Sequence, residues 1–140
     1  MSLTDPQVWL LVVAAAHLGF QLTVSVVVYP ALRDVGADAW PAAHERHSRR
    51  IAPLVAALYV PLVLVLAWTA VVEPQAAGTW LALVGGAISV VTTAAIAAPL
   101  HGRLGAARDR PDLLHALRQA DVMRTVGAAV CLVGAVLLVP

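Results

Sequence analysis

Histidine and arginine side chains gather in two short segments of this 140-residue chain. All 9 cationic residues are arginines in segments 33–50 and 103–124, and four of the 5 histidines lie in or beside those segments. Histidine exchanges protons near neutral pH, whereas arginine stays charged and can hold an anionic or enolic oxygen. We expect a pocket in which such groups transfer protons and stabilise a developing anion. The predicted catalytic residues are His47, His101 and Arg124.

A second polar feature runs along an apolar segment near the N-terminus. His17, Gln21, Ser25 and Tyr29 recur at every fourth position among Val, Leu and Ala. A polar group inside a bilayer normally faces the interior of a helix bundle, where it can mark a functional site. The alternative is that the stripe only makes interhelical hydrogen bonds, which are worth about 0.6 kcal/mol each on average. On the functional interpretation, these four residues and His115 bind the substrate.

The histidine spacing also raises the question of a metal site. His44-x-x-His47 places two imidazoles on one face of a helix, and His101 and His115 could complete a set of four ligands. Neutral imidazole suits zinc, copper or iron. Di-iron sites in bundles use several inward Glu side chains, and no Glu stands at Glu-x-x-His spacing on that face. The cofactor therefore stays open between a transition metal, a haem and none.

The arginine nearest to an apolar segment needs a partner. Arg124 lies at the start of the last apolar segment, on the same helical face as Gly127, where it can bend inward. A charged side chain inside a bilayer costs a few kcal/mol on insertion scales unless it is paired. Asp121, three residues earlier, is the predicted partner.

Long apolar segments must position all of these residues. Of the chain, 61% is hydrophobic and only 12% is charged, unlike a soluble domain of this size. A helix that crosses a bilayer needs about 20 mainly apolar residues. We therefore predict one all-α domain, residues 1–140, folded as a four-helix transmembrane bundle. The predicted spans are about 8–29, 51–72, 79–100 and 122–139.

The arginines also predict how the bundle sits in the membrane. They occupy the first and third connections between spans, whereas Glu73–Gly78 and the C-terminus hold none. By the positive-inside rule, the arginine-rich connections are cytoplasmic and both termini are extracytoplasmic. We expect a multi-pass protein of the cell membrane, without a cleavable signal peptide because Met1–Gln7 lacks Lys and Arg. Because topology explains the arginines, nucleic acid is not an expected partner.

Two helices are expected to begin before they reach the bilayer. The second begins near Asp38–Pro41 and the fourth near Asp109–Pro111, so both start in the cytoplasmic interface. Pro53 and Pro61 lie inside the second span, where each removes a backbone hydrogen bond and should bend the helix.

Small residues form seams along three of the spans. In lipid, helices associate through close backbone packing along such seams, because no hydrophobic force drives them together. We expect a compact bundle, and a homo-oligomer could form through the same kind of face. The predicted seams are Gly78, Ala82, Gly86, Ser89, Thr93 and Ala97; Gly127, Cys131 and Gly134; and Ala15, Gly19 and Thr23.

Four short motifs mark the ends of the spans: Tyr29-Pro30-Ala31-Leu32, Trp40, Pro99-Leu100-His101 and Arg124-Thr125. In these motifs the chain resembles the anthrone oxygenase-like family of small four-span membrane proteins. The family tends to have His at the position of Tyr29 and Asn at the position of His101. Because the family includes enzymes that oxidise polycyclic phenols, the resemblance implies an oxidoreductase that acts on a lipophilic aromatic or quinone-like compound.

Two functions from different classes remain open. The first is a membrane enzyme whose partners are a lipophilic small molecule and membrane lipid. The second is a non-enzymatic membrane protein, either a small transporter or an assembly partner. Inverted repeats would favour transport, and the sequence shows none. An aromatic content of 5% is low for a pocket that binds aromatic compounds.

Overall fold

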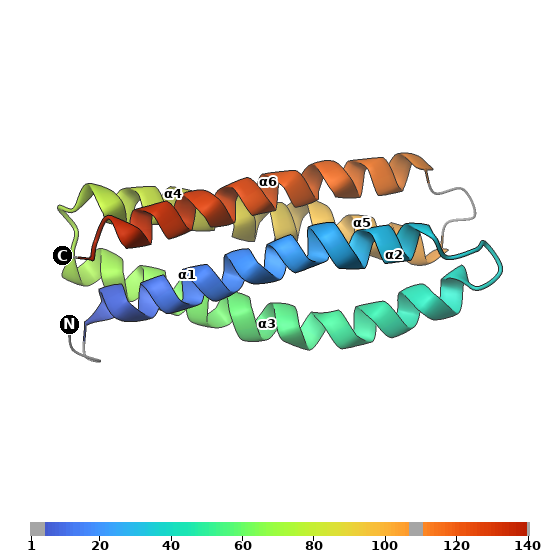
Figure 1. Ribbon diagram of the computed structural model, residues 1–140, viewed down its shortest axis with the longest axis horizontal. Coiled ribbons are helices and arrows are strands. Elements are labelled where there is room, and N and C mark those ends of the chain that lie inside the picture. Colours follow the sequence, from blue (N-terminus) through green and yellow to red (C-terminus); the bar gives the residue numbers. More distant parts are fainter. Residues whose placement is uncertain (1–4, 107–110, 140) are drawn as a thin grey trace.

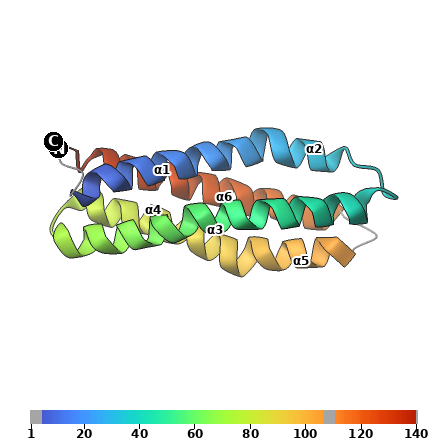
Figure 2. The same ribbon diagram turned by 90° about the horizontal axis from the view of Figure 1, so that it is seen from below.

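The computed structural model describes residues 5–106 and 111–139, which form a bundle of four helical spans (Figure 1). The spans alternate in direction along the long axis, and both termini lie at one end (Figures 1 and 2). We call the opposite end, which carries the connection 34–39, the arginine-rich end. The elements are α1 (Pro6–Thr23), η1 (Val24–Val28), α2 (Tyr29–Arg33), α3 (Trp40–Val72), α4 (Ala77–Thr92), η2 (Thr93–Ala97), α5 (Ala98–Ala106) and α6 (Pro111–Val136).

All four spans are long and apolar enough to cross a membrane. Their outward surface is apolar as well: the exposed fractions of Val26, Leu64 and Val71 are 71%, 64% and 79%. Large apolar side chains exposed along the whole length of a bundle are typical of helices that face lipid. The predicted all-α four-helix bundle is confirmed, and it is consistent with an integral membrane protein.

The closest packing joins α4 to α6 along the predicted small-residue seams. A Cβ atom placed on Gly127 would lie 2.7 Å from the Gly85 carbonyl oxygen and 2.7 Å from Ser89 Oγ. A Cβ on Gly78 would lie 2.7 Å from the Gly134 carbonyl oxygen. Side chains at these glycines would therefore push the two helices apart, so small residues allow this pair to pack closely. The predicted seam is corrected at one position: Gly85 faces Gly127, whereas Gly86 packs against Leu66 of α3.

The seam predicted on the first span is wrong. Ala15, Gly19 and Thr23 are exposed, and a Cβ atom placed on Gly19 would meet no neighbouring side chain or helix within 4 Å. His17 is buried instead. A helix turns by about 100° per residue, so His17 and Gly19 point in nearly opposite directions and cannot both face the interior. The polar stripe, not the small residues, decides which face of α1 turns inward.

Two wide π-helical turns, η1 and η2, interrupt the first and third spans. The amide of Tyr29 bonds the Val24 carbonyl and the amide of Ala98 bonds the Thr93 carbonyl, five residues back in each case. A proline follows directly each time, at Pro30 and at position 99. A proline ring clashes with the carbonyl four residues before it, and widening the preceding turn relieves that clash. The spans therefore continue through their prolines.

As a result the helices extend beyond the predicted spans toward the arginine-rich end. The first span does not end near residue 29 but continues to Arg33, and α5 continues past residue 100 to Ala106. As predicted, the second helix begins early, at Trp40; it then runs unbroken through Pro53 and Pro61. Helix α6 begins at position 111 and ends at position 136, short of the predicted residue 139, and Asp109 lies outside the described residues.

Candidate functional site

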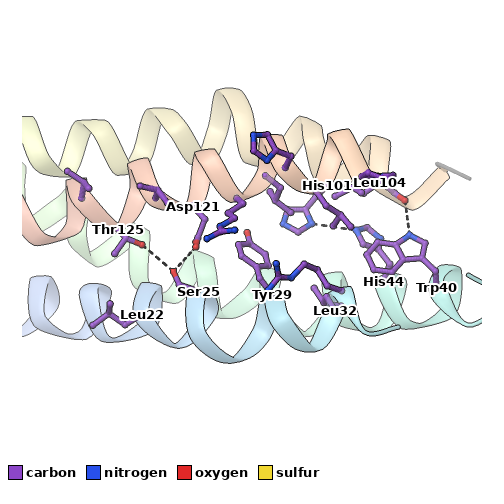
Figure 3. Close-up of a pocket in the computed structure, with 18 residues that line it drawn as sticks. Leu22, Ser25, Tyr29, Leu32, Trp40, His44, His101, Leu104, Asp121 and Thr125 are labelled. Atoms are coloured by element: carbon purple, nitrogen blue, oxygen red, sulfur yellow. Dashed lines mark hydrogen bonds between the residues drawn. The ribbon is translucent and has the colours of Figure 1, made fainter. Parts of the chain in front are cut away.

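A cavity of about 820 Å³ lies in the arginine-rich half of the bundle. The first span forms one wall and α6 the other, while α3 and α5 close its far end (Figure 3). Its volume falls within the range of roughly 300–1,000 Å³ that is typical of small-molecule sites. The apolar part of the lining includes Leu22, Leu32, Leu104, Leu117, Val122 and Val126, and the polar part includes Ser25, Tyr29, His44, His101, His115 and Asp121.

The apolar side of this cavity opens sideways. Leu22 on the first span and Val122 and Val126 on α6 line the cavity and are also 48%, 56% and 54% exposed. They lie on the apolar outer surface of spans that are long enough to cross a membrane. These residues therefore connect the lining of the cavity with the outer surface of the bundle between the first span and α6.

A charged cluster lies at and directly behind the inner wall of the cavity. The Arg124 guanidinium donates to Asp121 Oδ1 at 2.9 Å and to the Tyr29 hydroxyl at 2.8 Å. Ser25 Oγ lies 2.6 Å from Asp121 Oδ2 and 3.4 Å from Thr125 Oγ1 (Figure 3). Asp121 and Arg124 are only 3% and 6% exposed. The predicted pairing of these two charges is confirmed, and each keeps the other neutralised in a dry environment.

Hydrogen bonds continue from this cluster around the interior of the bundle. Gln21 Nε2 donates to the Tyr59 hydroxyl at 2.9 Å, and that hydroxyl lies 2.8 Å from Thr93 Oγ1. Thr93 donates its single hydroxyl hydrogen to the Ser89 carbonyl, so Tyr59 must donate to Thr93. Ser89 Oγ in turn donates to the Arg124 carbonyl at 2.8 Å.

The circuit closes through Ser25, whose Oγ lies 2.9 Å from the Gln21 carbonyl as well as beside Asp121. One hydroxyl hydrogen can serve only one of these two acceptors at a time. The circuit touches all four spans and both π turns, a kind of helix defect that is frequent at functional sites. We call it the polar ring: Gln21, Ser25, Tyr59, Ser89, Thr93, Asp121 and Arg124.

Several buried polar atoms in and beside the polar ring have no hydrogen-bond partner. They are both ring nitrogens of His17, Gln21 Oε1 and Arg124 Nε. His17 packs edge-on against Tyr59, with ring centroids 4.7 Å apart. Unsatisfied buried groups are rare in proteins, and where they occur they indicate ordered water or a functional role. At the inner end of the polar stripe, His17 and Gln21 thus bury polar atoms that no hydrogen bond within the described protein satisfies.

His44 and His101 meet at the far end of the cavity, and His47 lies beside them just outside its lining. His44 Nε2 lies 3.5 Å from His101 Nδ1, and the ring of His47 lies 6.0 Å from that of His101. The rings of Trp40 and His44 lie 5.2 Å apart and are tilted by 35°, and Trp40 Nε1 donates to the Leu104 carbonyl at 3.0 Å, which ties α3 to α5 (Figure 3). His101 also lies 6.4 Å from the ring of Tyr29, so it links the histidines to the charged cluster.

The predicted four-histidine metal site is only partly assembled. His44, His47 and His101 are neighbours, but His115 lies on the α6 side of the cavity and bonds Gln119 at 3.2 Å. Within residues 5–106 and 111–139, no three His, Cys, Asp or Glu side chains gather in a way that could hold a metal ion. The described residues therefore do not form a metal site.

The predicted catalytic trio is distributed over three environments. His101 lines the cavity directly. Arg124 lies behind the wall and reaches the cavity only through Tyr29 and Asp121, which do line it. His47 lines a separate shallow depression on the outer surface of α3. The three do not converge on one point. They are linked in sequence, because His47 lies beside His101, His101 lies beside Tyr29, and Tyr29 accepts a hydrogen bond from Arg124.

The predicted substrate-binding residues divide in a similar way. Ser25, Tyr29 and His115 line the cavity, whereas His17 and Gln21 are fully buried beyond its inner end. Sequence reasoning missed Tyr59 and gave Thr93 only a packing role; both close the polar ring. A signal for Tyr59 existed, because a tyrosine in the middle of an otherwise apolar span normally has a buried partner.

No family model, characterised protein or solved structure matches the chain.

Proposed function

We propose that this protein binds a lipophilic aromatic or quinone-like molecule in the cavity and acts on it as an oxidoreductase. The cavity carries the proposal, because it combines a mouth on the lipid-facing surface with a charged, dry inner wall. Most small-molecule sites share this plan of apolar walls and a few fixed polar groups. The resemblance to the anthrone oxygenase-like family supports the enzymatic part of the proposal.

His101 and Tyr29 are the groups that would touch such a substrate. His101 can accept the proton of a phenolic hydroxyl, and its two histidine neighbours keep it at the cavity wall. Tyr29 accepts a hydrogen bond from Arg124, so its own hydroxyl hydrogen is free to donate to the phenolate oxygen. Arg124 and Asp121 act as positioning residues that fix Tyr29.

The redox step needs an electron acceptor, and we assign dioxygen. A diphenol loses two protons and two electrons and becomes a quinone, while dioxygen gains both and becomes hydrogen peroxide. The protein contributes the ionisation of the phenol, because a phenolate gives up electrons more readily than the neutral phenol. Apolar walls keep the reactive intermediate away from bulk water.

The arginine bias supports an orientation for this site. In our proposal the arginine-rich end faces the cytoplasm of a cell-membrane protein, so the cavity lies in the cytoplasmic half of the bilayer.

Oxygen consumption by the purified protein in lipid nanodiscs, with an alkylated hydroquinone as substrate, tests the proposal. Turnover above that of empty nanodiscs is expected, and His101→Ala should lower kcat by about 10²–10⁴-fold, the usual contribution of a general base. Thr69→Val, a buried site far from the cavity, should retain activity. Binding of the hydroquinone without turnover would refute the enzyme and leave a membrane carrier or binding protein.

A further inference from the structure

We propose that the preferred ligand of the cavity is a small lipophilic acid, held by its anionic group between Arg33 and Arg118. This inference rests on the proposed function, because it assigns the substrate class of the same cavity. Arg33 comes from α2 and Arg118 from α6, and both line the cavity from opposite walls. Both are exposed at the arginine-rich end, where the cavity leaves the apolar part of the bundle.

Among residues 5–106 and 111–139, neither arginine forms an ion pair. Within the described part of the chain, the ion pairs are Arg49 with Glu45 and Arg124 with Asp121. Arg33 and Arg118 thus bring two positive charges to one rim, and no carboxylate of the described residues is bonded to either. The positive-inside rule accounts for arginines at this end of the bundle, but not for two that face each other across a cavity. An anion between them would neutralise both charges and could accept bidentate hydrogen bonds.

The distance between the rim and the charged cluster suits a compact amphiphilic molecule. Arg33 follows Tyr29 by four residues and Arg118 precedes Asp121 by three, which places the rim about 4.5–6 Å along the helix axes from the charged cluster. The apolar mouth lies on the other side of that cluster, with Val126 about 7.5 Å beyond Asp121 along α6. A bound molecule would therefore keep its anion at the rim and its reacting hydroxyl one helical turn deeper.

The inner charged cluster does not compete for this anion. Arg124 is already paired with Asp121 and bonded to Tyr29, so the inner wall presents a neutral pair to a ligand. The acid is held where the protein charge is uncompensated, and its apolar body is held where the lining is apolar. The cavity volume suits one drug-sized molecule, so we assign a compact acid in preference to a two-chain phospholipid.

Anthracene-2-carboxylate and 2-(hydroxymethyl)anthracene are matched probes for this test, since they share one ring system and carry an anionic and a neutral substituent of similar size at the same position. Trp40 lines the cavity and can transfer excitation energy to a bound anthracene. Replacing the exposed Trp9, Trp68 and Trp80 by Phe leaves it as the single donor. Binding is titrated in phosphatidylcholine nanodiscs, with empty nanodiscs as the partition blank.

The acid should bind about tenfold or more tightly than the alcohol, and Arg33→Gln/Arg118→Gln should remove that preference while leaving the alcohol affinity unchanged. Arg50→Gln/Arg103→Gln, which removes the same charge from residues outside the cavity lining, should change neither affinity. Equal binding of both probes, or an equal loss in the control pair, overturns the rim assignment but leaves the proposed function intact. Failure of both probes to bind overturns the cavity itself.

A lipid headgroup is the other source of the same anionic chemistry. Native mass spectrometry of protein from phosphatidylglycerol nanodiscs separates the two. A phospholipid adduct that is present in the wild type and lost in Arg33→Gln/Arg118→Gln would assign the rim to membrane lipid and overturn the small-acid assignment. An adduct pattern that is unchanged by those substitutions supports it.

Discussion

Removing one member of the Asp121–Arg124 pair should be far more damaging than removing both. Asp121→Leu leaves the buried guanidinium of Arg124 with only the Tyr29 hydroxyl, and it also strips Ser25 of its shortest contact. Breaking a buried ion pair costs about 3–5 kcal/mol because one charge stays buried without its partner. At about 4 °C per kcal/mol for a chain of this size, the melting temperature should fall by about 12–20 °C. Arg124→Met should have a similar effect.

The double variant Asp121→Leu/Arg124→Met should recover most of that loss, to within about 2 kcal/mol of the wild type, because no uncompensated charge remains. Ser25 can then bond the Gln21 carbonyl, which is already 2.9 Å away. Cys131 is the single cysteine and is fully buried, so a thiol-reactive dye reports unfolding directly in detergent. The exposed Glu45–Arg49 pair is the control: Glu45→Gln should cost less than about 1 kcal/mol. Single variants as mild as Glu45→Gln, or a double variant worse than either single, would refute the reasoning.

Further variants test the packing, the polar ring and the orientation of the bundle. Gly127→Leu should prevent α4 and α6 from packing and abolish a monodisperse preparation in detergent, whereas Gly19→Leu, on an exposed face with open space around it, should behave as the wild type in size-exclusion chromatography. Tyr59→Phe should lower the free energy of unfolding by about 1–3 kcal/mol in the same dye assay, because it leaves Gln21 and Thr93 without their shared hydroxyl. His17→Leu should be neutral or stabilising, because neither imidazole nitrogen has a hydrogen-bond partner to lose. A destabilised His17→Leu variant would show that ordered water or another group bonds the ring. Cysteines introduced at Ala76 and Gly36 should label from outside and from inside the cell respectively, and the reverse pattern would overturn the orientation.

The fold was predictable because membrane spans are encoded by composition. Runs of about 20 apolar residues fix the number of spans whatever their neighbours are. The polar stripe was predictable for a related reason: lipid offers His17 and Gln21 no hydrogen-bond partner, so both side chains should face the bundle interior, and both are buried. The α4–α6 seam followed from its glycines. Its counterpart on α1 did not, since small residues are equally stable against lipid chains.

The site was harder to predict because it depends on register between helices. Ser25 lies in the π turn η1 and Tyr29 directly follows it, so their contacts with Asp121 and Arg124 depend on the face that this turn gives the first span. The proline after the turn does not predict it by itself, because Pro53 and Pro61 lie inside α3 without a π turn. Histidine spacing placed His44 and His47 on neighbouring positions of one helix. It could not show that His44 would turn into the cavity while His47 remains on the outer surface.

Blocking the mouth of the cavity is the most direct test of the central claim, that a lipophilic molecule enters between the first span and α6. Val126 and Val133 both lie on α6, two turns apart, and are 54% and 52% exposed, but only Val126 lines the cavity. In the single-Trp40 background, Val126→Phe should weaken binding of 2-(hydroxymethyl)anthracene at least tenfold, while Val133→Phe should bind it as the parent protein does. Equal affinities for the two variants would contradict the account.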